Sequence, residues 1–118
     1  MSEIIPATKA FRSKVAAAVA AGGTVPAITH VAWGTDGTAE TQNDTSLGSE
    51  IYRQTPTTTA DGTILTVDAI LEGGKVTGST LREVGVIDSD GDLAGRRAFA
   101  PKQLESETDI EATLELQF

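Results

Sequence analysis

The stretch T-L-R-E-V-G-V-I-D-S-D-G-D-L-A, residues 80–94, predicts two β-strands joined by a tight, acidic turn. The first strand is expected over Leu81–Ile87 and the second over Leu93–Phe99. Arg82 and Glu83 are adjacent in the first strand, where successive side chains point to opposite faces of a sheet. Because charges inside an otherwise apolar strand need partners, we expect at least one of them to occupy a partly buried pairing site.

Further strands are predicted on both sides of this hairpin. The clearest is Asp109–Phe118, in which apolar and polar residues alternate strictly, and Ile64–Leu71 has one wholly apolar face. Shorter strands are expected at Ile28–Trp33 and Ile51–Thr55, and Pro101 is expected to end the second strand of the hairpin. No long helix separates these strands, so the sheet should be mainly antiparallel.

One helix is predicted, over residues 6–21. The segment is rich in alanine, which has the highest helix propensity, and Gly22-Gly23 supplies a left-handed stop. Apolar side chains recur every four residues along it: Phe11, Val15 and Val19. We expect this narrow stripe to pack on the sheet. Elsewhere, Asp44 is expected to cap a single helical turn at 45–48, and the polar segment 57–62 is expected to contain a turn.

The predicted fold class is therefore α+β, with one N-terminal helix packed on a mainly antiparallel β-sheet or small β-sandwich. The 118 residues correspond to a single domain, residues 1–118. Hydrophobic residues make up 39% of the chain and the mean hydropathy is −0.09, values typical of a soluble globular protein.

Charge and composition exclude several classes of partner. The net charge of −8 would repel a phosphate backbone, so no nucleic-acid partner is expected. The chain has no cysteine and one histidine, which excludes disulfides and thiol catalysis and argues against a zinc site. The longest apolar run, Val15–Ala21, is far shorter than the ~20 residues of a membrane span. We expect no secretory signal, no membrane association and assembly in a cytoplasm.

Few residues are candidates for chemistry. The run Asp88–Asp92 holds three carboxylates and could begin a Ca²⁺ loop, but the chain returns at once to a strand, which favours a tight turn without a metal. His30 lies in a predicted strand without a serine or cysteine partner, so we expect no catalytic residue, no cofactor and no enzymatic activity. Arg96-Arg97, the only adjacent basic pair, is expected on a solvated strand edge.

A second charged motif, S-E-I-Y-R at residues 49–53, suggests partners for the first. Our hypothesis is that Arg53 reaches Glu83 and that Glu50 is a possible partner for Arg82, because four charges interrupt core-like strands. These four residues are the candidate structural or interaction ion pairs. The alternative is that all four side chains are solvated on the wet faces of their strands.

Taken in order, these runs resemble the N-terminal domain of phage tail-collar fibre proteins, which attaches fibres to the baseplate of a contractile tail. The resemblance begins with the helix that ends in Gly22-Gly23 and continues through I-T-H-V-A-W-G-T-D-G, residues 28–37. It also includes D-T-S-L-G-S-E-I-Y-R, residues 44–53, and L-R-E-V-G-V-I-D-S-D-G-D-L-A, residues 81–94. Each run is short, and their order and spacing together carry the likeness.

The resemblance implies a structural virion protein of a phage tail that mediates protein–protein assembly after synthesis in the host cytoplasm. It implies other tail or baseplate proteins and copies of itself as partners, in a homotrimer. The long fibre shaft of the family does not follow Phe118 here, so a tail-collar or fibre base, or a baseplate adaptor, fits better than a receptor-binding fibre. The alternative is a small carbohydrate- or calcium-binding module, with a site around Asp88–Asp92 and Trp33.

Overall fold

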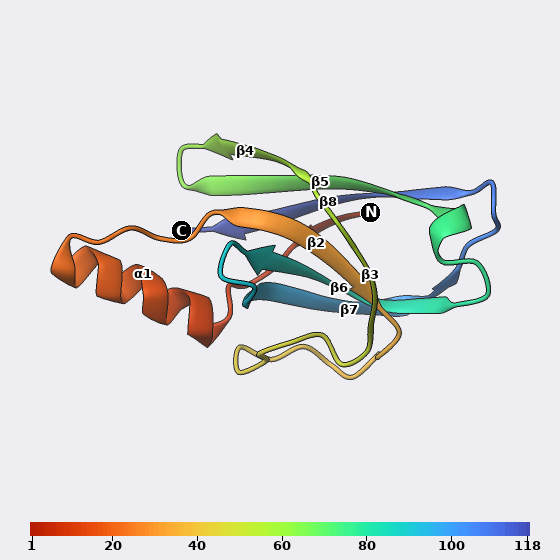
Figure 1. Cartoon of the computed structure of the whole chain (residues 1–118), viewed down its shortest axis with the longest axis horizontal. Coiled ribbons are helices and arrows are strands. Elements are labelled where there is room, and N and C mark those ends of the chain that lie inside the picture. Colours follow the sequence, from red (N-terminus) through yellow and green to blue (C-terminus); the bar gives the residue numbers. More distant parts are fainter.

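Eight β-strands form two four-stranded β-sheets that face each other, and a single α-helix lies at one end (Figure 1). The computed structural model describes all residues from Met1 to Phe118. Along the chain the elements are β1 (Ser2–Ile4), α1 (Lys9–Ala21), β2 (Ile28–Gly34), β3 (Glu50–Gln54), β4 (Thr57–Asp61), β5 (Ile64–Glu72), a 3₁₀ turn (Gly73–Lys75), β6 (Thr80–Asp88), β7 (Leu93–Gln103) and β8 (Asp109–Gln117).

The two sheets have strand orders β1-β8-β5-β4 and β3-β2-β6-β7. All strand pairs are antiparallel except β1 with β8, which are parallel. The chain crosses from one sheet to the other after β1, β3, β5 and β7, so the fold is a β-sandwich with one helix. The expected antiparallel arrangement is confirmed, although the protein is richer in strand than an α+β fold with a single sheet.

The inner faces of the sandwich form the core. The predicted apolar faces of β5 and β8 are confirmed, since their central residues are almost fully buried: Val67, Ala69, Leu71, Ala112, Leu114 and Leu116. Opposite them lie side chains of β2 and β6, among them Val31, Trp33, Val84 and Val86. Burial of such side chains is the main favourable term in the stability of the fold.

The hairpin of β6 and β7 is confirmed, but Pro101 does not end it. β7 continues to Gln103, and the pairing register shifts between Leu81 and Glu83. Pro101 falls within this irregular stretch, because Leu81 pairs with Lys102 while Glu83 pairs with Ala98. A proline at a bulge does not remove a regular ladder hydrogen bond, which explains why the strand tolerates it.

The predicted helix forms, but it begins at Lys9 and not at residue 6, and it does not lie across a sheet face. Thr8 caps it by accepting a hydrogen bond from the Phe11 N–H (3.2 Å), and Gly22 ends it in the left-handed conformation (φ 71°). Phe11 is the only fully buried residue of α1, and Val19 is 79% exposed. The helix therefore projects from one end of the sandwich, because its alanine-rich stripe offers too little apolar area to cover a sheet.

Two strands and one loop differ from the expectation. β1 and β4 were not predicted: β1 is only Ser2–Ile4, and β4 is the polar segment Thr57–Asp61, exposed throughout. Neither has an alternating apolar pattern, so only its pairing with a neighbouring strand makes it a strand. The helical turn expected at 45–48 does not form. Residues 35–49 are instead one irregular connection.

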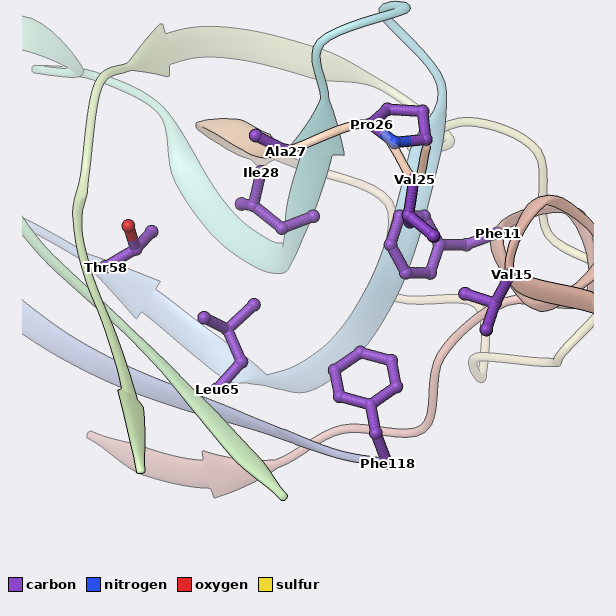
Figure 2. A pocket seen from close by; sticks show the side chains of 9 residues that line it. All are labelled: Phe11, Val15, Val25, Pro26, Ala27, Ile28, Thr58, Leu65 and Phe118. Atoms are coloured by element: carbon purple, nitrogen blue, oxygen red, sulfur yellow. The ribbon is translucent and has the colours of Figure 1, made fainter. Parts of the chain in front are cut away.

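An apolar groove of about 430 Å³ opens at the helix end of the sandwich (Figure 2). Its walls come from α1, from the segment that leads into β2, and from β4, β5 and the C-terminal residue: Phe11, Val15, Val25, Pro26, Ala27, Ile28, Thr58, Leu65 and Phe118. The protein contains no helix of the length and apolar character that a membrane crossing requires.

Candidate functional site

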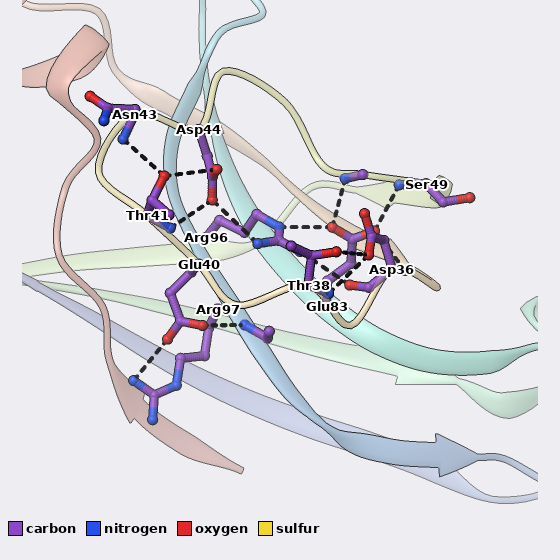
Figure 3. A network of polar contacts seen from close by, with 12 residues as sticks. Asp36, Thr38, Glu40, Thr41, Asn43, Asp44, Ser49, Glu83, Arg96 and Arg97 are labelled. Atoms are coloured by element: carbon purple, nitrogen blue, oxygen red, sulfur yellow. Dashed lines mark hydrogen bonds and ion pairs between the residues drawn. The ribbon is translucent and has the colours of Figure 1, made fainter.

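The most unusual group in the protein is the carboxylate of Glu83, which is fully buried on β6 beneath the connection 35–49 (Figure 3). It accepts backbone N–H hydrogen bonds from Asp36 (3.0 Å), Gly48 (2.8 Å) and Ser49 (2.8 Å). The fourth donor is the Nε–H of Arg96, at 2.9 Å. A buried carboxylate with three backbone donors and a cation is well compensated for the loss of water.

Arg96 lies on β7 directly opposite Gly85 and is 4% exposed. Besides Glu83, its guanidinium donates to Asp44 Oδ2 (3.2 Å) and to the carbonyl oxygen of Asp36 (3.1 Å). Burial lowers the pKa of Arg96, but the hydrogen bond and charge of Glu83 and the charge of Asp44 outweigh it, so the pKa is raised. The guanidinium therefore stays charged and fastens the connection to the sheet at Asp36 and at Asp44.

Apolar contacts complete the attachment of this connection. Leu47 packs with Ala32, Ile87 and Leu93 in a second, smaller core on the outer face of the sheet. Gly85 lies beneath it, since a Cβ at this position would lie 2.8 Å from the Leu47 side chain. The connection 35–49 is thus a packed layer over the sheet.

Gly34 is a second position where close approach requires glycine. A Cβ there would collide with the carboxylate of Glu83 and with the carbonyl oxygen of Ser49. The same backbone also binds the connection directly, because the Thr35 N–H donates to that carbonyl at 3.0 Å. The end of β2 therefore depends on the absence of a side chain to reach the Glu83 network.

The edge of the network is more exposed and more weakly held. Glu40 accepts from the Ala98 N–H (3.2 Å) and pairs with Arg97 at 3.3 Å, and Arg97 also pairs with Glu3 at 3.4 Å. Arg97 is 37% exposed at its side chain, so these pairs contribute far less than the buried one. Their effect is to close the side of the connection against β7 and β1.

The proposed pairing of Arg53 with Glu83 is wrong. Arg53 and Glu50 pair with each other on β3, with Arg53 Nη2 2.8 Å from Glu50 Oε1. Glu50 therefore does not pair with Arg82, and Arg82 forms no ion pair at all. Arg82 Nε is buried without a hydrogen-bond partner.

The reason for these errors is the register shift in β6. A strict alternation would place Arg82 and Glu83 on opposite faces, but the pairing of β6 with β7 is irregular between Leu81 and Glu83. Both side chains consequently reach the same connection. The Arg82 side chain would lie 3.4 Å from a Cβ at Gly37, and Glu83 accepts from Asp36.

Sequence reasoning also missed Arg96, which was expected on a solvated strand edge. In the β6–β7 ladder Gly85 pairs with Arg96, so Arg96 is a diagonal neighbour of Glu83 on the same face. Counting the register outward from the acidic turn would not have indicated this pair, because the register also shifts between Val86 and Ile87. A regular count would place Arg97, and not Arg96, on the face of Glu83, and it gives no sign that a loop buries the pair.

The acidic turn after β6 holds a lysine. Lys14 Nζ of α1 lies 2.7 Å from Asp88, 3.1 Å from Asp90 and 2.8 Å from Asp92. These hydrogen bonds, above all those to Asp88 and Asp92, raise the pKa of Lys14. The other oxygen of Asp88 accepts from the N–H groups of Asp90 and Asp92, both at 3.0 Å, as the predicted tight turn requires.

Addition of Ca²⁺ is expected to leave the thermal unfolding midpoint of the native protein unchanged. The ammonium group of Lys14 already occupies the position between the three carboxylates that a divalent cation would take, and it offsets part of their negative charge. Thermal unfolding followed by circular dichroism, with millimolar Ca²⁺ or with EDTA, measures this. A midpoint that rises with Ca²⁺ concentration would contradict the assignment, because a ligand that binds only the folded state must stabilise it.

The other candidate residues lie apart from the network. Trp33 is fully buried in the core and its Nε1–H donates to Gln54 at 2.8 Å, so it cannot stack on a sugar. Trp33 and Asp88 are also at opposite ends of β2, since Trp33 pairs with Val84 and Ile28 pairs with Asp88. His30 is partly buried, with Nδ1 2.9 Å from Thr29 Oγ1. The structure therefore does not bring Trp33 and Asp88–Asp92 together into the site that the alternative carbohydrate-binding module would need.

The Glu83 network restrains backbone conformation. Its donors come from the two ends of the connection 35–49 and from β7, so its chemical effect is to hold the connection in one arrangement on the sheet. A fixed loop of this kind presents a preformed surface to a partner.

Acid is expected to loosen this attachment through Asp44. Burial raises the pKa of Asp44, but hydrogen bonds from Thr41 and the charge of Arg96 outweigh it, so the pKa is lowered. A carboxyl group whose pKa is lower in the folded than in the unfolded protein stabilises the fold at pH values above its unfolded-state pKa, about 3.9. This contribution is lost as the pH falls through the folded-state pKa.

The stability difference between the native protein and Asp44→Asn should therefore be constant from pH 7 to about 5 and shrink below about pH 4. Urea unfolding at a series of pH values measures it. A difference that stays the same down to pH 3 would show that Asp44 does not contribute through its charge.

Comparison of the chain with protein-family models, with curated proteins and with solved structures found no match.

Proposed function

We propose that this chain is a structural protein of a phage tail, a tail-collar or fibre-base component or a baseplate adaptor. It would act by binding, through interfaces with other tail or baseplate proteins and with copies of itself, and not by catalysing a reaction. Its location would be the virion, after assembly in the host cytoplasm.

The observation that carries the proposal is the convergence of three runs on one buried group. The runs 28–37, 44–53 and 81–94, on which the likeness to tail-collar fibre proteins is based, contribute Asp36, Gly48 with Ser49, and Glu83 respectively. The likeness thus concerns one physical unit, the connection and the carboxylate that fixes it, rather than three separate turns.

This unit suits assembly because the surface it presents is already ordered. Ordering a loop on binding costs free energy, and a loop that is fixed beforehand does not incur this cost. The exposed surface of the connection 35–49 and the neighbouring edge strand β3 are the surfaces we assign to contacts within the particle. β8 is not among these surfaces as a free edge, since it pairs with both β1 and β5.

We assign the copies of the chain to a homotrimer, the oligomer that the resemblance implies. Closed cyclic symmetry is the common solution for identical subunits. Size-exclusion chromatography with light scattering should give a mass three times the 12.2 kDa of the chain. A monomer at high micromolar concentration would remove the trimer from the proposal.

The tail assignment is tested on particles. Purified contractile-tail particles from cells that express the chain should contain it at a fixed ratio to the sheath protein, and an antibody against it should label one position on the tail in electron micrographs. Recovery of the chain only in the unassembled fraction, with unlabelled and complete tails, would overturn the proposal. The variant Val19→Ala, at an exposed residue of α1 outside the assigned contact surfaces, should still be incorporated, which provides a control.

A further inference from the structure

The first residues of β2 have no strand on their outer side. β3 pairs with β2 only at Val31–Gly34, and the chain then crosses to the other sheet, where β4 begins. Ile28–His30 consequently pair with β6 alone. Their outward backbone groups form a free strand edge, which can serve as a template for another strand.

This free edge borders the apolar groove at the helix end. Ile28 forms one wall and Leu65 the opposite wall, with Phe118 and Phe11 towards the helix (Figure 2). Thr58, on β4, is the one polar residue among the nine that line it. A groove of this kind can bind an extended peptide in two ways. The free strand edge forms hydrogen bonds with the peptide backbone, and the apolar walls bury the peptide's side chains.

We propose that this groove accepts an extended segment of another protein, which pairs with Ile28–His30 and inserts alternate apolar side chains between the two sheets. Successive side chains of a strand point to opposite sides, so every second residue of the segment would enter the groove. The segment would occupy, beside β2, the position that β3 leaves when it crosses to β4. This inference rests on the proposed assembly function for the assumption that the partner is a protein.

A second copy of this chain does not provide such a segment. The large apolar side chains that are exposed lie singly along the sequence: Ile4, Val19, Val25, Ile51, Ile70 and Phe118. No two of them are two residues apart, as an inserted strand requires. The occupant must therefore come from a different protein.

Charge indicates a further property of the occupant. α1 has no acidic residue in its sequence, and Arg12 lines a second hollow that adjoins the groove through Val15 and Phe118. The guanidinium of Arg12 donates only to the neutral side chain of Gln42 (3.0 Å) and forms no ion pair. Lys14, by contrast, is already paired with three carboxylates. The segment should therefore carry an acidic residue where it passes Arg12.

The probe is the blocked peptide acetyl-Glu-Val-Thr-Ile-Thr-Val-Thr-amide, titrated into the ¹⁵N-labelled full chain and followed by NMR up to several millimolar. We expect saturable shifts at the amides of residues 28–30 and at Phe118. The same peptide N-methylated at alternate amides should bind at least tenfold more weakly, since it cannot pair with a strand edge. Replacing its glutamate with lysine should weaken binding measurably.

Protein variants localise the contact. Val15→Asp places a charge in the groove and should weaken peptide binding at least tenfold, whereas Val19→Asp, one turn further along α1 and 79% exposed, should leave it unchanged. Phe118→Ala, at a residue that is 55% exposed, is a second groove variant that does not depend on the helix.

Absence of shifts at several millimolar peptide, shifts elsewhere on the surface, or equal binding of the N-methylated peptide would each overturn the strand-acceptor proposal. These outcomes are separate from the tail assignment. If the antibody labels the tails but the peptide does not bind the chain, only the strand-acceptor proposal for the groove is refuted. Specific peptide binding by a chain that is absent from particles would refute the tail function and leave the groove standing.

Discussion

Replacement of Arg96 with methionine is expected to lower the free energy of unfolding by about 3–5 kcal/mol, the usual cost of removing one partner of a buried ion pair. The variant retains most of the side-chain volume but leaves the fully buried Glu83 carboxylate without its cation. It also removes the hydrogen bonds to Asp44 and to the Asp36 carbonyl that fasten the connection 35–49. Urea unfolding followed by circular dichroism measures the loss.

Arg97→Met is the matched control. Arg97 is the next residue on the same strand, forms two ion pairs and is 37% exposed. Its replacement should cost no more than about 1 kcal/mol, as for other exposed pairs. Equal losses for the two variants would mean that burial does not distinguish them, and the assigned role of Arg96 would be wrong.

Replacement of Trp33 with alanine is expected to destabilise the protein by about 3–5 kcal/mol, as for other large-to-small changes in a core. Trp33 is fully buried, lies edge-on to Phe99 with ring centroids 6.5 Å apart, and donates a hydrogen bond to Gln54. Because the stability of a domain is only about 5–15 kcal/mol in total, this variant should be close to unfolding.

Circular dichroism must follow this unfolding, since Trp33 is the only tryptophan. Val19→Ala, at a residue that is 79% exposed, should change stability by less than about 0.5 kcal/mol and controls for the loss of an apolar side chain at the surface. A loss below about 1 kcal/mol for Trp33→Ala would place the indole outside the core, and a surface role in ligand binding would again be open.

Local patterns predicted most of the fold. The strict alternation of Asp109–Phe118 and the apolar face of Ile64–Leu71 led to β8 and β5, and the acidic turn after Ile87 led to the β6–β7 hairpin. In each case the pattern itself reflects burial on one face, so the sequence contains the information. β1 and β4 were missed because their strand state depends on neighbours that are distant in sequence.

For the candidate site, the sequence predicted the kind of group involved, a buried charge that needs a partner, but not which residue is the partner. Glu83 was correctly singled out as a charge that needs a buried partner, but the partner was misassigned to Arg53 instead of Arg96. The choice depends on a register shift in β6 and on a long polar connection that folds back over the sheet. Neither follows from composition or periodicity, since a bulge is a property of two paired strands.

A double-mutant cycle on Glu83 and Arg96 tests most directly whether this buried pair holds the connection on the sheet. The single variants Glu83→Gln and Arg96→Met and their combination should give a coupling energy of at least about 1.5 kcal/mol, and the same cycle on Glu83 and Arg53 should give about zero. A coupling between Glu83 and Arg96 within about 0.5 kcal/mol of zero would contradict the account.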